Sequence, residues 1–164
     1  MTTASTERSA TEPERAPVLR LLSAESAKLV ASVAERCFTD PWSHAVIAAA
    51  LSAPQNAAIG AYRDGGLCGF LFVSAGADEG EISDLAVLPE ARRSGVGSAL
   101  LREGLRILRE RGCDSVFLEV RESNTAARAL YTAFGFLPCG VRRHYYRNPP
   151  ENACLYKLSL KPEG

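Results

Sequence analysis

The residues with the clearest chemical use form a short loop between an apolar segment and the start of a long helix. Ile82 to Leu88 reads as a strand, and Arg92-Arg93-Ser94-Gly95-Val96-Gly97 follows it after Pro89. The first N–H groups of a helix have no partner within the helix, and the helix dipole places partial positive charge there. Glycines at 95 and 97 leave room for close approach. The pattern therefore predicts a binding site for phosphate or pyrophosphate.

Two familiar phosphate-binding patterns do not occur in this loop. Gly97 is followed by Ser98-Ala99, so the Lys-Ser/Thr ending of a nucleotide triphosphate loop is missing. The dinucleotide pattern G-x-G-x-x-G fails at Leu100. The pattern present is a basic residue, two others, Gly, any residue and Gly. By itself it is compatible with an ordinary flexible turn, whereas the preceding strand and the following helix favour an anion site.

A second group of candidate residues follows on the next strand and helix. Alternation along the strand places Glu119 on the side of Phe117 and Arg121, so Glu119 is either catalytic or half of a solvated pair. Tyr131 is either a proton donor or a helix-packing aromatic. Asn124 is equally good as a plain helix cap.

These segments resemble the GNAT acetyltransferases. Arg92, Gly95 and Gly97 stand at the defining positions of that superfamily's acetyl-CoA pyrophosphate loop. The motifs LEVR-x-SN, ALY-x-x-x-GF and R-R-x-Y-Y, with Asp40-Pro41-Trp42-Ser43 near a helix start, are similar to the RimI type, the ribosomal-protein alanine N-acetyltransferases. The similarity is dense from Glu81 to Arg147, sparse from Val18 to Asp78, and does not extend to the residues before Val18.

The resemblance implies acetyl-CoA as cosubstrate, no metal, and a set of residues around the cofactor. The strand would contact pantetheine through backbone groups, the loop would hold the pyrophosphate, and Asn124 would lie near the thioester arm. Glu119 would be the general base and Tyr131 the general acid. The implied cofactor-binding residues are Leu85, Ala86, Val87, Arg93, Ser94, Gly95, Val96, Gly97, Ser98 and Asn124.

Several of these roles have alternatives. Arg92 and Arg93 are also compatible with surface charges. Asp84 and Glu81 are reserve candidates for the base, because other GNAT enzymes take it from the strand before the loop.

The two catalytic roles follow from the chemistry of amide formation. An α-amine has a pKa of about 8, so at neutral pH much of it carries a proton and cannot attack. A carboxylate can accept that proton, directly or through a water. The departing thiolate needs a proton in turn, since a thiol has a pKa of about 8.5. This route needs no covalent enzyme intermediate and therefore no catalytic cysteine.

The resemblance also implies an acceptor, the N-terminal Ala of a small-subunit ribosomal protein. A small-molecule amine, another protein N-terminus, and a non-catalytic acyl-CoA-binding module remain as alternatives. The basic and aromatic run Arg142 to Arg147 would form a wall of the acceptor groove rather than an RNA contact. Asn152 departs from the family, which usually has an acidic residue there, and leaves peptide specificity open.

Composition limits the other classes of function. The 164 residues suit one domain, and the formal net charge of +0 indicates neither nucleic acid nor a membrane surface as partner. The five cysteines form no C-x-x-C pair, so reduced thiols and a cytoplasmic location are expected. Residues 1–17 are predicted to be a disordered extension, and residues 18–164 a single GNAT domain.

Periodicity and turn signals predict an α/β (α+β) fold in the order β-α-α-β-β-β-α-β-α-β-β. The sheet is expected to be mixed, mostly antiparallel, with helices on both faces. Expected strands are Val18 to Leu22, Ala57 to Arg63, Leu67 to Ser74, Glu81 to Leu88, Ser115 to Arg121, Phe136 to Tyr146 and Ala153 to Leu160. Expected helices run from a Ser23 cap to about Cys37, from a Ser43 cap through Leu51, from Gly95 to Arg111, and from a Ser123 or Asn124 cap to Phe134.

Overall fold

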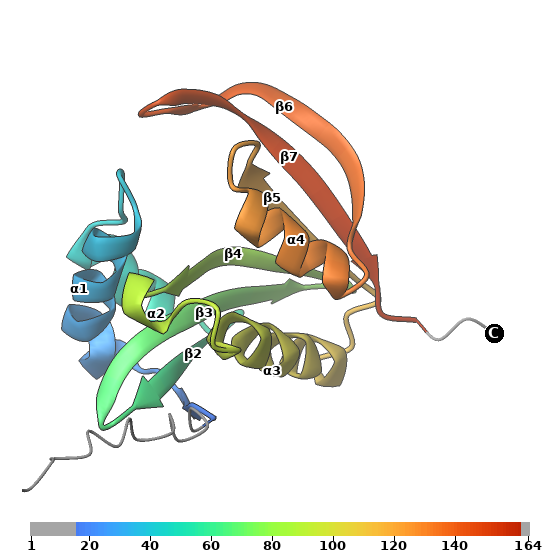
Figure 1. The fold of residues 1–164 in the computed structure, drawn as a ribbon. Coiled ribbons are helices and arrows are strands. Elements are labelled where there is room, and N and C mark those ends of the chain that lie inside the picture. Colours follow the sequence, from blue (N-terminus) through green and yellow to red (C-terminus); the bar gives the residue numbers. More distant parts are fainter. Residues whose placement is uncertain (1–15, 162–164) are drawn as a thin grey trace, which may run out of the picture.

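The computed structural model describes residues 16–161, and these form seven strands and four α-helices in the predicted order (Figure 1). The strands are β1 (Val18–Leu21), β2 (Asn56–Arg63), β3 (Gly66–Gly76), β4 (Glu79–Val87), β5 (Ser115–Arg121), β6 (Leu137–Arg147) and β7 (Pro150–Ser159). The helices are α1 (Ala27–Cys37), α2 (His44–Ser52), α3 (Val96–Glu110) and α4 (Thr125–Ala133). The division into an extension, residues 1–17, and one domain, residues 18–164, stays a prediction, because residues 1–15 and 162–164 lie outside the described part.

All seven strands belong to one sheet with the order β1-β2-β3-β4-β5-β7-β6. Neighbouring strands are antiparallel except β4 and β5, which are joined through α3 and run parallel. A connection that includes a helix is what a parallel pair requires. The predicted mixed, mostly antiparallel sheet is therefore confirmed.

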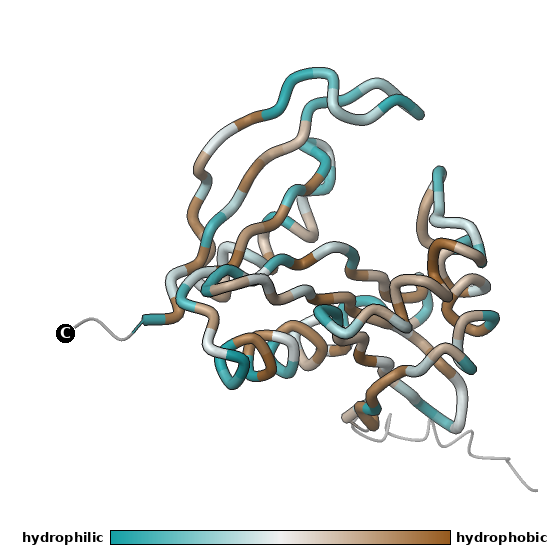
Figure 2. The backbone as a smooth tube through the Cα atoms, turned by 180° about the vertical axis from the view of Figure 1, so that it is seen from behind, coloured by the Kyte–Doolittle hydropathy of each residue, from teal (hydrophilic) through white to brown (hydrophobic). Residues whose placement is uncertain are grey.

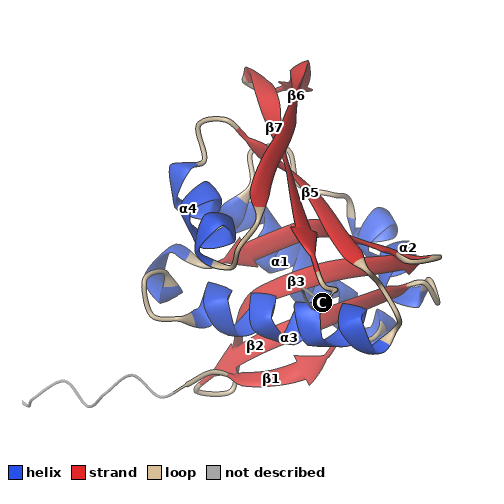
Figure 3. Cartoon of the chain, turned by 90° about the vertical axis from the view of Figure 1, so that its right-hand side faces the viewer, coloured by secondary structure: helices blue, strands red, loops and turns tan. Residues whose placement is uncertain are grey.

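Helices cover both faces of the sheet (Figure 3). On one face α3 packs closely, because Gly104 lets the helix backbone approach Leu71 and Val73 of β3. On the other face lie α1 and α2, and Trp42 between them meets Phe72 edge-on with ring centroids 5.6 Å apart. The buried core between the layers contains no polar or charged residue within the described ranges.

Turns and caps account for most element boundaries. Asp64 and Gly65, both with positive φ, make the expected tight turn between β2 and β3. Ser43 accepts a hydrogen bond from Val46 N, and Asn124 from Ala127 N, as N-caps do. The predicted Ser23 cap is wrong: its side chain makes no cap hydrogen bond, and a short 3-10 turn, Ala24–Ser26, precedes α1.

The strand ends differ from expectation at β4 and β7. β4 begins at Glu79, two residues before the predicted start, because Glu79 already pairs with Gly76 of β3 across the turn between the strands. β7 begins at Pro150, where it pairs with Arg147. A proline is tolerated as the first residue of a strand. The β6–β7 hairpin is thus longer than predicted and extends beyond the body of the sheet, with a hydrophilic tip (Figures 1 and 2).

The pairing of β4 with β5 stops early. It covers only Glu79–Ser115 to Ile82–Leu118, although both strands continue. Ile82 pairs with Val73 and Asp84 with Phe72, so Ser83 is an extra residue, a bulge, where the pairing ends. Beyond this bulge the edge of β4 that faces β5 has no strand partner, and the two strands leave a gap between them.

Gly69 of β3 lets α3 and β4 come together at the loop end of the sheet. A Cβ atom there would lie 2.8 Å from the Ala86 carbonyl oxygen and 3.2 Å from Val96 Cγ1. Since a backbone carbonyl in a strand cannot move aside cheaply, we predict that Gly69→Ala lowers the free energy of unfolding by about 1–3 kcal/mol. Gly76→Ala, at the open end of the same strand, is the control, because a Cβ there meets nothing within 4 Å. Equal denaturation midpoints for the two variants would contradict the prediction.

Candidate active site

The predicted anion loop has the geometry of an open helix start. Gly95 is the N-cap of α3, has φ of 85°, and makes no side-chain cap hydrogen bond. The first helical hydrogen bond runs from Ala99 N to Gly95 O at 3.0 Å. The N–H groups of Val96, Gly97 and Ser98 therefore have no partner within the helix. A Cβ at Gly97 would lie 3.3 Å from Leu130 Cδ2 and 3.8 Å from Val87 Cγ2, so that position lies where α3 meets α4 and the end of β4.

Arg63 holds this loop from the end of β2. Its guanidinium donates to Ser94 Oγ at 2.6 Å and to the Ser94 carbonyl at 3.0 Å, and Ser94 Oγ donates to the Ala91 carbonyl. Arg92 adds a bond from Nε to the Val87 carbonyl at 2.9 Å. These contacts hold Arg93 at a φ of 61°, which is uncommon for a residue with a side chain. Sequence reasoning missed Arg63, because nothing in a lone arginine at a hairpin end indicates a contact 31 residues away.

The gap between β4 and β5 extends from the bulge at Ser83 toward this loop. Leu85, Ala86 and Val87 line it on β4, and Asn124 stands at the start of α4. Asn124 is exposed, and its side-chain oxygen is used by the cap. The structure thus brings the predicted cofactor residues to one end of the sheet. Their contacts with a cofactor stay a prediction.

Glu119 lies on the face of β5 that α1 and α2 leave uncovered. Its side chain is 28% exposed and forms an ion pair with Arg142 of β6, at 3.0 Å from Nε. The carboxylate also accepts a hydrogen bond from Tyr145, which raises the pKa of that phenol. A hollow of about 450 Å³ adjoins these groups, lined also by Glu81, Phe117 and Leu155.

Tyr131 approaches the gap from α4. Its ring is 5% exposed and meets Phe136 edge-on, with centroids 5.6 Å apart. Its hydroxyl makes no hydrogen bond within the described residues, where no buried side-chain polar atom lacks a partner. The oxygen therefore keeps contact with solvent although the ring is buried. Burial raises the pKa of Tyr131, and the charges of Asp84 and Tyr146 raise it further.

The two reserve candidates on β4 differ in their surroundings. Glu81 is exposed and pairs with Phe117 of β5. Asp84, directly after the bulge, is half-buried, and burial raises the pKa of its carboxyl to about 7 despite a hydrogen bond from the Leu85 backbone. A carboxyl with such a pKa is suited to handling protons near neutrality.

The β6–β7 hairpin closes the open side of this region. Its tip contacts the loop between α1 and α2, where Thr39 Oγ1 donates to the Asn148 carbonyl at 2.9 Å. Arg121 donates to the Pro149 carbonyl at 3.0 Å and lies over the Tyr146 ring at 4.2 Å. The hairpin is therefore held at its tip by the loop between α1 and α2 and by β5.

Asn152, which departs from the family pattern, has a local structural role. Its side-chain oxygen accepts a hydrogen bond from His144 N at 3.0 Å, where β6 bulges and His144 has φ of 55°. Its amide nitrogen donates to Glu122 Oε2 at 3.4 Å. An aspartate would keep the first contact and place two negative charges together at the second.

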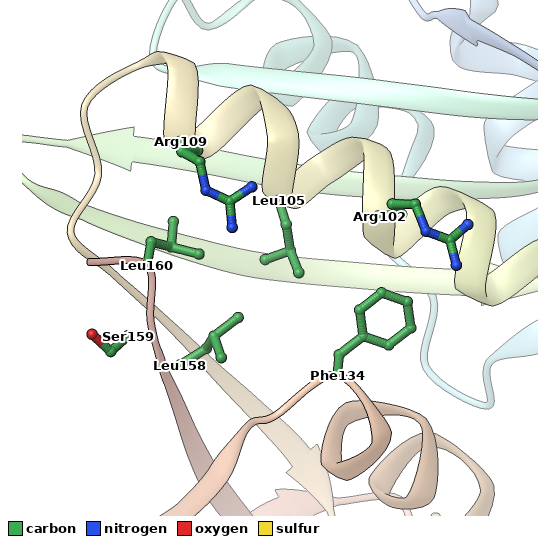
Figure 4. A pocket seen from close by; sticks show the side chains of 7 residues that line it. All are labelled: Arg102, Leu105, Arg109, Phe134, Leu158, Ser159 and Leu160. Carbon is green, nitrogen blue, oxygen red and sulfur yellow. The ribbon is translucent and has the colours of Figure 1, made fainter. Parts of the chain in front are cut away.

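A smaller hollow of about 250 Å³ lies elsewhere, between α3, α4 and the end of β7 (Figure 4). Its lining includes Arg102, Leu105 and Phe134, and none of the predicted site residues. Within the described ranges no three His, Cys, Asp or Glu side chains gather as metal ligands would. No helix there is long and apolar enough to cross a membrane.

Comparison with known proteins agrees with this geometry. Residues 27–136 match the model of the acetyltransferase (GNAT) family. The N-alpha-acetyltransferase RimI of Mycobacterium tuberculosis is 39% identical over 112 residues, which cover 66% of this chain and 69% of that protein. The ribosomal protein bS18-alanine N-acetyltransferase of Escherichia coli K12 is 39% identical over 84 residues, 51% of this chain and 57% of that one.

A solved structure of the same family is similar over more of the chain. The crystal structure of the ribosomal-protein-S18-alanine N-acetyltransferase from Escherichia coli superimposes with a TM-score of 0.83 at 29% identity, covering 90% of this chain and 96% of that one. The expectation of a GNAT fold with the RimI type of sequence is confirmed. The chain belongs to the GNAT acetyltransferase family and is an acetyl-CoA-dependent N-acetyltransferase.

Proposed function

We propose that this enzyme transfers the acetyl group of acetyl-CoA to the α-amine of a protein N-terminus, the N-terminal Ala of a small-subunit ribosomal protein of the bS18 type. The observation that carries the proposal is the gap between β4 and β5, with Glu119 on one side and Tyr131 on the other, in a chain similar to bS18-alanine N-acetyltransferases. A ribosomal acceptor places the reaction in the cytoplasm.

Acetyl-CoA would enter from the loop side. The N–H groups of Val96, Gly97 and Ser98 would bind the pyrophosphate, with Arg93, Ser94 and Gly95 completing the loop. Pantetheine would extend along Leu85, Ala86 and Val87, whose edge has no strand partner, and pass Asn124. Backbone groups left unpaired by the gap can then be satisfied by the amide groups of pantetheine.

The acceptor would arrive from the opposite side, beneath the β6–β7 hairpin. Glu119 takes a proton from the ammonium group, directly or through a water. The neutral nitrogen attacks the thioester carbonyl carbon, and the carbon–sulfur bond breaks. Tyr131 gives its proton to the departing sulfur, and the nitrogen, now bonded to carbon, releases its second proton, which restores the phenol of Tyr131. Because Arg142 pairs with Glu119 in the free enzyme, the acceptor must share or displace that ion pair.

The raised pKa of Tyr131 bears on the last step. It keeps the phenol protonated at neutral pH, which a proton donor requires. A phenol is a weaker acid than a thiol in water, with pKa values of about 10 and 8.5. Burial disfavours the tyrosinate and the thiolate alike, so the transfer depends on Tyr131 recovering the second proton that the attacking nitrogen loses as it becomes an amide.

Acetyl transfer from labelled acetyl-CoA to a panel of acceptors tests the proposal. The panel holds peptides starting with Ala, Ser, Met and Gly, their N-acetylated forms, and small polyamines. We expect label on the α-amine of the Ala peptide, located by mass spectrometry, and none on the blocked form. Label on a lysine side chain or a polyamine alone would overturn the proposed acceptor.

The cofactor position predicts the effect of filling Gly97. The side chain of Gly97→Val would press against Val87 and Leu130, beside the loop that would hold the pyrophosphate. We predict at least a ~10-fold loss of acetyl-CoA affinity by calorimetric titration, about 1.4 kcal/mol. Gly97→Ala should lose less affinity, since its methyl group requires only the Leu130 side chain to shift. A folded Gly97→Val protein with unchanged affinity would remove the assignment.

The role of Glu119 predicts a loss that pH partly reverses. Glu119→Gln should slow transfer ~10²-fold or more, since a general base contributes that much. Raising the pH should recover part of the rate, because the amine then loses its proton unaided. Steady-state rates measured from pH 6 to 9 test both the loss and its recovery. If Glu119→Gln kept the wild-type rate and Glu81→Gln lost most of its activity, the general base would be Glu81 on β4.

The role of Tyr131 predicts different outcomes for two substitutions. Tyr131→Phe keeps the packing against Phe136 but removes the proton, so kcat should fall ~10²-fold with little change in KM for acetyl-CoA. Tyr131→Ala should also lower stability by about 3–5 kcal/mol through a cavity. Kinetics and melting curves separate the two effects. A fully active Tyr131→Phe enzyme would mean that water or another group supplies the proton.

A further inference from the structure

Asp84 is a carboxylate in poorly solvated surroundings with no cationic partner. None of the ion pairs among the described residues includes it, and its only hydrogen bond comes from the Leu85 backbone. The sheet neighbour is Phe72, which packs against Trp42 and Phe70. Removing a carboxylate from water without a cation is costly, so such a group is a strong candidate for a functional role.

The titratable groups that feel the charge of Asp84 are the thiol of Cys37 on α1 and the phenol of Tyr131 on α4, and Tyr146 of β6 acts on Tyr131 in turn. Two arginines also act on Cys37, but Arg36 is paired with Glu90 and Arg92 donates to the Val87 carbonyl. Burial raises the pKa of Cys37 and of Tyr131, and it raises that of Tyr146 to about 12. None of these groups therefore supplies a positive charge to Asp84 near neutral pH.

The charges on the two sides of the gap are unequal. On β5, Glu119 is balanced by Arg142 at 3.0 Å. On β4, Asp84 lies just past the bulge, where the strands separate, and it has no such balance. Among the described residues, Asp84 is thus a half-buried carboxyl group at the gap that no ion pair offsets, whereas Glu81 on the same strand is exposed to water.

We propose that Asp84 binds the α-ammonium group of the acceptor and positions it between the thioester and Glu119. This inference rests on the proposed function. The substrate supplies the missing cation: the ammonium donates one N–H to Asp84 and loses another proton to Glu119. The nitrogen then forms its bond to the carbonyl carbon and releases its second proton, which replaces the proton that Tyr131 gives to the departing sulfur. Since the amide product is neutral, the ion pair is lost and the product dissociates.

The ionisation of Asp84 sets the pH dependence of acceptor binding. Its pKa of about 7 in the free enzyme means that below this pH the carboxyl is mostly protonated and must release a proton to pair with the ammonium. Above a pH of about 8 the α-amine itself loses its charge. Binding should therefore be tightest between these two values and weaken on either side.

Calorimetric titration of the full chain saturated with CoA tests this without turnover. The ligand is an Ala-starting peptide, and its N-acetylated form is the neutral control. We expect Asp84→Asn to bind the free peptide at least ~10-fold more weakly and the blocked peptide unchanged. Asp78→Asn, the same chemical change on the exposed turn before β4, should bind both peptides like wild type. At pH 6, wild type should release up to one proton on binding, measured in buffers of different ionisation enthalpy, and Asp84→Asn none.

Steady-state kinetics distinguish binding from proton transfer. For Asp84→Asn we expect KM for the peptide to rise at least ~10-fold while kcat stays within ~3-fold, and Asp84→Glu should recover part of the KM. A large fall in kcat at constant KM would make Asp84 the proton acceptor instead. Unchanged peptide affinity in a folded Asp84→Asn protein would also overturn the proposal. A wild-type enzyme that acetylates no N-terminal peptide would be a failure of the proposed function itself.

Discussion

The separation of β4 from β5 is the constraint on which the rest of the site depends. One extra residue, Ser83, shifts the register against β3 at the point where parallel pairing with β5 ends. Bulges bend a strand and increase its local twist, and they are frequent beside active sites. The unpaired edge of β4 then needs partners for its backbone groups, and an extended amide-bearing arm can supply them. Under the proposed function, the gap would hold the cofactor because the sheet is left incomplete there.

The elements around the gap place the residues of the proposed reaction on the two faces of the sheet. α3 and α4 bring the open N–H groups and the Tyr131 hydroxyl to one side. β5, β6 and β7 bring Glu119, Arg142 and Tyr145 to the other, where α1 and α2 do not reach. The thioester and the amine can thus approach from opposite sides and meet in line. The contact of Thr39 with Asn148 ties the hairpin to the loop between α1 and α2, on the side from which the proposed acceptor would approach.

Sequence reasoning succeeded where a local pattern determines the structure. The order of elements, the Asp64-Gly65 turn, the Ser43 and Asn124 caps and the Gly95 helix start all follow from neighbouring residues. It failed where the determinant is distant. The contact of Arg63 with Ser94 joins the end of β2 to the loop before α3, and the pairing of Asn152 with His144 depends on a bulge in β6. The prediction of a Ser23 cap failed because a 3-10 turn, Ala24–Ser26, precedes α1, so that Ser26 occupies the N-cap position of the helix.

The carboxylates show why residue type alone could not rank the candidates. Glu81, Asp84 and Glu119 are all acidic and all lie near the gap, yet they differ in exposure and in charge balance. Glu81 is solvated, Glu119 is paired with a cation on another strand, and Asp84 is neither. A solvated carboxylate gains little from an incoming ammonium, because water already stabilises it. A poorly solvated one gains more, since the cation replaces the hydration that burial removed. The bulge at Ser83 therefore has two consequences. It ends the pairing of β4 with β5, and it places Asp84 where, under our proposal, the ammonium group of the acceptor binds.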